Sequence, residues 1–239
     1  MLVDLHTHIL PGVDDGAETI EQSLALLEAE RQNGVEAVVF TPHFLPQNET
    51  PERFLKRRDE AFQFLLSRAP TDLKYLCGAE VLYSQYLANL EDLPKLCIGD
   101  TDYLLLELPY QAPFTDKLFS AIWRIVDEYA ITPIIAHVER YAAVQKDPEL
   151  LLQFKEMGCH IQVNASTMIR REMRQIAKRI VRTGTVDLLA SDCHDTEFRA
   201  PNLKAGFEAA QKHFDTHFVH LMQYTAQTIF EDREWESWN

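Results

Sequence analysis

Several features are missing from this sequence of 239 residues, and each absence excludes a class of protein. No stretch approaches the ~18 uninterrupted apolar residues of a membrane-spanning helix, and the start lacks the basic and apolar segments of a secretory signal. The four cysteines form no C-x-x-C pair, and a chain with this much apolar core needs no disulfide framework. We therefore expect a cytoplasmic protein without a membrane span.

Basic side chains are scarce, with 23 Lys and Arg against 37 Asp and Glu, which gives a formal net charge of −14. A surface that binds nucleic acid needs a basic face, so nucleic acid is not expected as a partner. No internal repeat or low-complexity linker divides the chain, and single α/β barrels commonly have this length. We predict one domain over residues 1–239, in which the tail 231–239, with Trp235 and Trp238, is either a docking element or frayed.

Short apolar runs alternate with amphipathic stretches from end to end, which predicts strands joined by helices. The strand candidates are seven runs, at residues 2–5, 36–40, 73–77, 103–106, 133–136, 160–163 and 186–190. Most are β-branched or aliphatic, as suits strands buried on both faces. This alternation is typical of parallel strands with right-handed crossovers, and seven strands favour an α/β, TIM-like barrel over an open sheet.

Helix start patterns precede several of the intervening segments. Thr19 and Gln22 have the spacing of a capping box, and Thr50 and Asp147 each stand before a proline, as at a helix N-terminus. The segment from about Thr115 shows a continuous apolar stripe at steps of three and four residues, which predicts a helix packed on a sheet.

Ligand-type side chains follow nearly every predicted strand. In a parallel barrel these ends open on one face, where such enzymes keep their active sites. Residues two apart in extended backbone share a side, so His6 and His8 are expected to point together, as are Asp192 and His194. The expected ligands are five histidines and four carboxylates, namely His6, His8, His43, His137, His194, Asp15, Glu80, Glu107 and Asp192.

Together these residue types predict a metal centre, although each is a weak indication by itself. A lone H-x-H is often structural, and a lone Glu80 or Glu107 is more often a surface or capped carboxylate. However, buried ionisable groups are costly unless they are paired or bound to metal, so a core built with one after almost every strand would be unusual. Imidazole and carboxylate without thiolate suit zinc, manganese or iron equally.

The motifs around these residues resemble the PHP superfamily of metal-dependent phosphoesterases. Residues 4–17 (DLHTHILPGVDDGA), 41–43 (TPH), 137–141 (HVERY) and 191–194 (SDCH) look like the bacterial tyrosine-protein phosphatases that accompany capsule and exopolysaccharide synthesis. The resemblance runs from His6 to about Leu203, and its first motif is the most specific. One departure is Val138, where the family often has proline; His137 and Arg140 on either side match.

The resemblance implies a distorted seven-stranded (β/α)7 barrel of the PHP type with three divalent metal ions, usually manganese, with iron or zinc as alternatives. It also implies that Arg140 and Arg199 hold the phosphate. By position it assigns the ligands in three groups, which are His6, His8, Glu80 and Asp192 for one ion, Glu80, Glu107 and His137 for a second, and Asp15, His43 and His194 for a third.

The activity implied is protein-tyrosine phosphatase, in which a metal-bridging hydroxide attacks phosphorus in line. The implied partner is a phosphotyrosine protein, namely the tyrosine-rich tail of a bacterial kinase that controls polymer synthesis. The oligomeric state is left open. Because tyrosinate is a good leaving group, with a parent pKa of about 10, we expect aryl phosphates to react in preference to alkyl esters. Asp195 is either the proton donor or a loop-capping residue.

Three alternatives compete with this interpretation. Cys193 and Arg199 satisfy C-x5-R, the pattern of cysteine-nucleophile phosphatases, but the five residues between them lack glycine and include two carboxylates that would repel phosphate. Another PHP phosphoesterase, acting on histidinol phosphate or a different small phosphomonoester, would use the same metal centre. A non-catalytic protein that binds the kinase tail would use the metals only for stability.

One further feature is a basic cluster in a chain that is acidic overall. It is interpreted either as a solvated helix face or as a surface for an acidic partner segment. The cluster comprises Arg170, Arg171, Arg174, Lys178, Arg179 and Arg182.

Overall fold

The computed structural model describes residues 1–232, in which every strand pair is parallel. The strands are β1 (Val3–Thr7), β2 (Ala37–Phe40), β3 (His43–Phe44), β4 (Lys74–Cys77), β5 (Glu80–Leu82), β6 (Tyr103–Glu107), β7 (Thr132–Ile135), β8 (His160–Asn164) and β9 (Leu188–Ala190). All seven predicted runs form strands. They make one sheet in the order β1-β2-β4 and a second in the order β3-β5-β6-β7-β8-β9.

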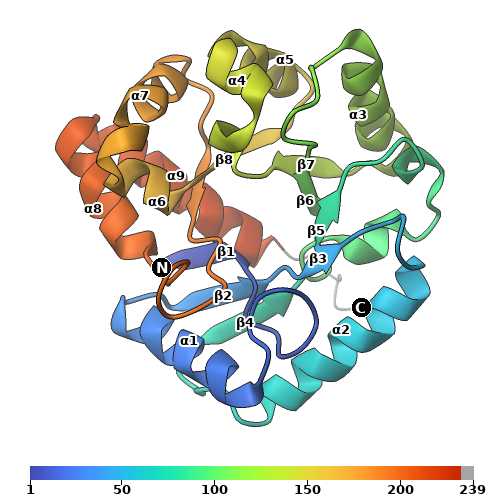
Figure 1. Cartoon of the computed structure of the whole chain (residues 1–239), viewed down its shortest axis with the longest axis vertical. Helices are drawn as coiled ribbons and strands as arrows, with labels where there is room; N and C mark the ends of the chain where they lie inside the picture. Colours follow the sequence, from blue (N-terminus) through green and yellow to red (C-terminus); the bar gives the residue numbers. More distant parts are fainter. Residues whose placement is uncertain (233–239) are drawn as a thin grey trace, which may run out of the picture.

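Helices surround these strands (Figure 1). They are α1 (Ile20–Gln32), α2 (Pro51–Leu66), α3 (Asp116–Tyr129), α4 (Ala142–Lys146), α5 (Leu151–Glu156), α6 (Ala165–Ile169), α7 (Arg174–Arg182), α8 (Leu203–His213) and α9 (Thr216–Glu231). Short 3-10 turns occur at η1 (Leu87–Asn89), η2 (Leu93–Leu96), η3 (Val138–Arg140), η4 (Pro148–Leu150) and η5 (Arg171–Met173). The predicted capping box of Thr19 and Gln22 is present, and the side chains of Thr50, Thr115 and Asp147 cap their helices.

The barrel prediction is confirmed only as a parallel α/β fold, since the described residues form two sheets and no closed barrel. β3 and β5 were not predicted. They arise because the chain leaves the first sheet after Phe40 and after Cys77 and pairs again at His43 and Glu80. Pro42, which has no N–H to donate to a ladder, lies at the first break. The two sheets approach each other where Thr7 bridges Cys193 and the N–H of His8 donates to the Cys193 carbonyl at 2.9 Å.

The apolar side chains form two clusters on either side of the strands. The larger one packs the helices against the sheets, and a smaller one lies among the strands and includes Val3, Leu5 and Leu188. Ile229 and Phe230 of α9 belong to this smaller cluster, and α9 packs against β1 and β9. This leaves the opposite, carboxyl ends of the strands for polar groups.

No helix among residues 1–232 is long and apolar enough to cross a membrane. Of the predicted tail 231–239, Glu231 is the last residue of α9, whereas Trp235 and Trp238 lie outside the described residues.

Candidate metal centre

All nine predicted ligands lie in one continuous network of side chains, and they come from β1, β3, β5 and β6 and from the segments after β1, β7 and β9. His43 and Asp15 are the least buried members; the Asp15 side chain, in the loop after β1, is 68% exposed. The other seven ligands are buried, namely His6, His8, Glu80, Glu107, His137, Asp192 and His194. The structure therefore brings the predicted residues together, and their role as metal ligands stays a prediction.

β1 is irregular beside the first two histidines. The register between β1 and β2 shifts between Asp4 and Thr7. Leu5 packs in the apolar cluster among the strands, and the next residue, His6, lies in the polar network, because successive residues of a strand face opposite sides. Bulges of this kind commonly re-aim side chains beside active sites.

Glu80 is the centre of the network. Its Oε1 lies 2.7 Å from His137 Nε2, and its Oε2 lies 2.9 Å from His43 Nδ1 and 3.3 Å from Nε2 of both His6 and His8. Burial acts to raise the pKa of Glu80, but the charge of His6 and hydrogen bonds from His137 and His43 outweigh it and hold the pKa well below its usual value. Glu80 is thus an ionised carboxylate that joins four imidazoles, which lie in or directly after β1, β3 and β7.

Asp192 is held by cations and by an amide. Its Oδ1 accepts from Arg199 Nη2 at 2.6 Å, and its Oδ2 accepts from Arg140 Nη2 at 2.5 Å and from Asn164 Nδ2 at 2.8 Å. Its Oδ1 also lies 3.5 Å from His6 Nε2. Burial opposes ionisation, but the charges of His6 and Arg140 and a hydrogen bond from His8 keep the pKa of Asp192 well below normal.

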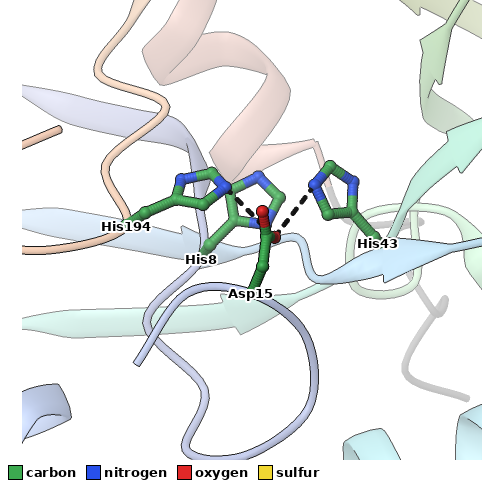
Figure 2. Close-up of side chains that lie close together, drawn as sticks. All are labelled: His8, Asp15, His43 and His194. Carbon is green, nitrogen blue, oxygen red and sulfur yellow. Dashed lines mark ion pairs between the residues drawn. The ribbon is translucent and has the colours of Figure 1, made fainter. Parts of the chain in front are cut away.

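Asp15 lies beside two histidines of the network, His43 and His194. Its Oδ1 lies 3.3 Å from His43 Nε2 and 3.5 Å from His194 Nε2, the two pairs dashed in Figure 2. The His8 ring lies between those of the other two histidines, with ring centroids 3.8 Å from His194 and 4.4 Å from His43. Four side chains from three separate parts of the chain thus face one small volume.

Two of these residues have strained backbones. His137, just after β7, has φ of 30°, and Asp192, just after β9, has φ of 54°. Non-glycine residues in this region cost on the order of 1–3 kcal/mol each, and such strain clusters at functional sites. Both strained positions place a side chain into the network.

The donor set fits divalent metal ions. Among residues 1–232, the buried nitrogens without a hydrogen-bond partner include His137 Nδ1 and His194 Nε2. The Nε2 atoms of His6 and His8 face each other at 3.1 Å. Buried polar atoms are normally paired, and imidazole with carboxylate is a ligand set for zinc, iron or manganese. Three compact groups could each hold an ion: His8, Asp15, His43 and His194; His6, His8 and Glu80; and His43, Glu80 and Glu107.

Sequence reasoning missed the role of Asp14. Its Oδ2 lies 2.6 Å from His8 Nδ1 and accepts the N–H of His43 at 3.0 Å, while its Oδ1 accepts the N–H of Gly16 at 3.0 Å. Burial raises the pKa of Asp14, but the charge of His8 and its hydrogen bond outweigh this and hold the pKa well below normal. A carboxylate on Nδ1 fixes the ring so that Nε2 faces the centre, as is typical of metal-binding histidines.

We expect Asp14→Asn to weaken metal binding about 10- to 100-fold, because the amide cannot act as a charged partner of His8. The metal dissociation constant, measured by competition with a chelator, checks this. Asp127→Asn, on the exposed face of α3, is the matched control and should bind metal as the unaltered protein does. Equal affinities for the two variants would contradict the role given to Asp14.

Two amides of β8 also support the centre and were not predicted as site residues. Gln162 Oε1 accepts the N–H of His137 at 2.7 Å and lies 3.3 Å from His6 Nδ1. Its Nε2 donates to Asn164 Oδ1 at 2.8 Å, and Asn164 in turn donates to Asp192. This relay couples three of the predicted ligands through one strand.

Asp195 was predicted to be either the proton donor or a loop-capping residue, and the structure supports the capping role. Its carboxylate accepts the backbone N–H groups of Glu197, Phe198 and Arg199. Its slight burial raises the pKa of Asp195, but these donors outweigh that effect and lower it. An acid that is ionised in this way is poorly suited to donate a proton, and its function is to shape the loop that carries Arg199.

Comparison with known proteins agrees with this geometry. Tyrosine-protein phosphatase CpsB of Streptococcus agalactiae is 28% identical over 225 residues, which cover 89% of this chain and 91% of that protein. Tyrosine-protein phosphatase YwqE of Bacillus subtilis is 24% identical over 241 residues, or 97% of this chain and 92% of that protein. A TatD-family hydrolase of Entamoeba histolytica shares the fold with a TM-score of 0.57 at 13% identity, covering 97% of this chain and 98% of that one.

A closer structural match comes from the pair YwqE of Bacillus subtilis and CpsB of Streptococcus pneumoniae, described as metal-dependent tyrosine phosphatases. Its TM-score is 0.84 at 22% identity, with 97% of this chain and 95% of that chain covered. The family described as capsular polysaccharide synthesis, CpsB/CapC, matches residues 2–231. With nearly its whole length matched, the chain belongs to the CpsB/CapC family.

Proposed function

We propose that this chain is a metal-dependent protein-tyrosine phosphatase that acts in capsule or exopolysaccharide synthesis. The observation that carries the proposal is the buried histidine and carboxylate network with Arg140 and Arg199 on Asp192 at its edge. The names of the CpsB and YwqE relatives support the same activity. In this proposal the two sheets act as one distorted seven-stranded barrel, in which β2 with β3 and β4 with β5 each count as one interrupted strand. The barrel forms a single domain.

The nine converging residues are proposed to hold three divalent ions, with manganese as the first candidate. Bound ions would polarise the phosphoryl oxygens and supply an activated water. The chain itself supplies Arg140 and Arg199, whose side chains are about one-third exposed, at 33% and 34%. Their planar guanidinium groups match pairs of phosphate oxygens and would orient the phosphoryl group for in-line attack.

A cavity of about 450 Å³ lies in front of this network and suits an aryl phosphate. Asp15, His43, Glu107, Tyr110, Arg140 and Arg199 are among its lining residues. Tyr110 donates its hydroxyl hydrogen to Glu107 Oε1 and accepts from Arg140 Nη1 at 3.4 Å, so its ring is fixed at the wall. We propose that this ring contacts the phenyl group of phosphotyrosine. Val13 and Leu45 add apolar surface to the same cavity.

The thiolate alternative conflicts with the surroundings of Cys193. Its side chain is fully buried, and its Sγ lies 3.6 Å from Glu30 Oε1. Burial and the nearby acids Glu30 and Asp4 raise the pKa of Cys193 well above the usual value. A nucleophilic cysteine needs the opposite, an accessible thiol with a lowered pKa.

We therefore expect Cys193→Ser to keep most of the phosphatase activity, within about threefold of the unaltered enzyme, because the thiol has no chemical role. The kcat for a phosphotyrosine peptide, measured with metal content, checks this. Cys159→Ser, another fully buried cysteine, controls for the effect of a hydroxyl in the core. Complete loss of activity in Cys193→Ser alone, with metals still bound, would restore the thiolate mechanism.

The proposed substrate is a phosphotyrosine protein in the cytoplasm, namely the tyrosine-rich tail of a bacterial kinase. All four cysteines are free and buried in the described part of the chain, as suits a reducing compartment. The second candidate, a phosphoesterase for histidinol phosphate or another small phosphomonoester, would use the same centre. The apolar wall beside Tyr110 favours an aryl substrate over it.

The deciding experiment measures hydrolysis by chelated and then metal-restored protein. A phosphotyrosine peptide, a phosphoserine peptide and histidinol phosphate are compared under the same conditions. Metal-restored turnover mainly of phosphotyrosine is the expected result. Turnover mainly of histidinol phosphate would move the proposal to the second candidate, and tight peptide binding without turnover in any metal would indicate a non-catalytic binding protein.

A further inference from the structure

A second cavity, of about 330 Å³, lies on the other side of the two phosphate-binding arginines. Arg140 and Arg199 line both this cavity and the one in front of the metal centre. The remaining wall comes from the end of β8, from α6, the turn η5 and the loop before α8, and α6 lies beside β8 in Figure 1. It includes Asn164, Ser166, Thr167, Arg170, Met173 and Phe198.

The charges of this second cavity favour an anion. Three arginines line it, at positions 140, 170 and 199, against the two carboxylates of Glu139 and Asp192. Both carboxylates already have partners inside the protein. Glu139, only 1% exposed, accepts from the Asn164 N–H and the Thr167 hydroxyl, and Asp192 accepts from two of the arginines. Neither of them neutralises Arg170.

Arg170 is exposed and forms no ion pair within residues 1–232. It stands at the C-cap of α6, where its N–H donates to the Ser166 carbonyl at 2.9 Å. α6 begins directly after β8 and packs tightly on α8, since a Cβ on Gly206 would lie 2.5 Å from Ala165 Cβ. The guanidinium is therefore carried by a rigid base a few residues from Asn164, which contacts the metal centre. Arg171 and Arg174 continue the basic surface outward.

We propose that this second cavity, defined by Arg170 with Arg140 and Arg199, binds an anionic side chain of the substrate that neighbours the phosphotyrosine. The inference rests on the proposed function, because the phosphotyrosine would occupy the cavity at the metal centre. A peptide that crosses the arginine pair brings its next side chains to Arg170. Phe198, 83% exposed at the rim, offers the apolar surface on which such a peptide can lie. The anionic group is a carboxylate or a second phosphate.

The test compares four phosphotyrosine peptides of equal length by kcat/KM, using the metal-loaded enzyme. The residues on both sides of the phosphotyrosine are asparagine in the first peptide and aspartate in the second. They are a non-hydrolysable phosphonate mimic of phosphotyrosine in the third peptide and lysine in the fourth. We expect the better of the two anionic peptides to exceed the asparagine peptide by about two- to fivefold, the range of an exposed ion pair. If the aspartate peptide has the higher kcat/KM, the group recognised is a carboxylate. If the phosphonate peptide has the higher kcat/KM, it is a phosphate.

Arg170→Ala should bring this ratio close to one, and Arg170→Lys should keep part of it, since the charge remains without the planar fork. Arg182→Ala, the same charge change at the far end of α7, is the control and should keep the ratio of the unaltered enzyme. An unaltered enzyme that hydrolyses all four peptides equally would overturn the inference, as would an equal loss of the ratio in Arg170→Ala and Arg182→Ala. Absence of hydrolysis of every peptide would instead overturn the proposed function.

Discussion

Replacing Glu80 by glutamine is expected to lower kcat/KM for a phosphotyrosine peptide by about a thousandfold or more and to release bound metal. Glu80 is the carboxylate that the imidazoles of His6, His8, His43 and His137 surround. Glutamine has nearly the same shape, but it carries no charge and would direct an N–H₂ group toward some of these nitrogens. Metal content by mass spectrometry and kcat/KM, measured on the same sample, check the prediction.

Glu60→Gln provides the matched control, because this exposed residue of α2 undergoes the same chemical change away from the centre. It should keep both metal content and activity. Thermal unfolding of each metal-free protein separates loss of metal from loss of fold. Full metal content with activity within tenfold of the unaltered enzyme in Glu80→Gln would show that Glu80 is not a central ligand.

The centre was largely predictable because the pattern that marks it is local. A short apolar run followed at once by histidine or carboxylate places that side chain at the carboxyl end of a strand, and parallel strands bring those ends together. Glu107 and Asp192 were found in this way, and His43 was found from its place shortly after the run 36–40, although it begins the separate short strand β3. The seven strand runs were correct for the same reason, since each depends on its own residues.

The features that were missed depend on contacts between distant segments. Asp14 and Asp15 are adjacent and chemically identical, so spacing could not show that Asp14 lies 2.6 Å from His8 while Asp15 faces His43. No sequence pattern predicts the left-handed backbone of Asp192, because only its surroundings impose that conformation. The pairing after the Pro42 break likewise involves a distant segment, because β3 then pairs with β5 and the Glu80 N–H donates to the Pro42 carbonyl at 3.1 Å.

Gly16→Ala is expected to destabilise the protein by about 3 kcal/mol or more, and to remove most of the activity. A Cβ at this position would lie 2.0 Å from the carbonyl oxygen of His8 and 2.6 Å from its Cβ, so the backbone must move. The loop that moves is the one in which Gly16 N–H donates to Asp14 and Ala17 N–H donates to the His8 carbonyl at 3.1 Å. Asp14 would lose His8, and Asp15 would lose its place beside His43.

Thermal unfolding and metal-restored kcat/KM measure both effects, and the melting temperature should fall by about 6 to 12 °C for a chain of this size. Gly158→Ala is the control, since Gly158 has φ of +83° and no other described atom lies within 4 Å of its Cβ position. It should cost only about 1 kcal/mol of left-handed strain and leave activity unchanged. Equal destabilisation by the two variants, with activity intact in Gly16→Ala, would mean that the loop can yield without displacing Asp14 and Asp15. The close approach of Gly16 to His8 would then be a matter of packing alone, and the position of Asp15 would have to be fixed by His43 and His194 themselves.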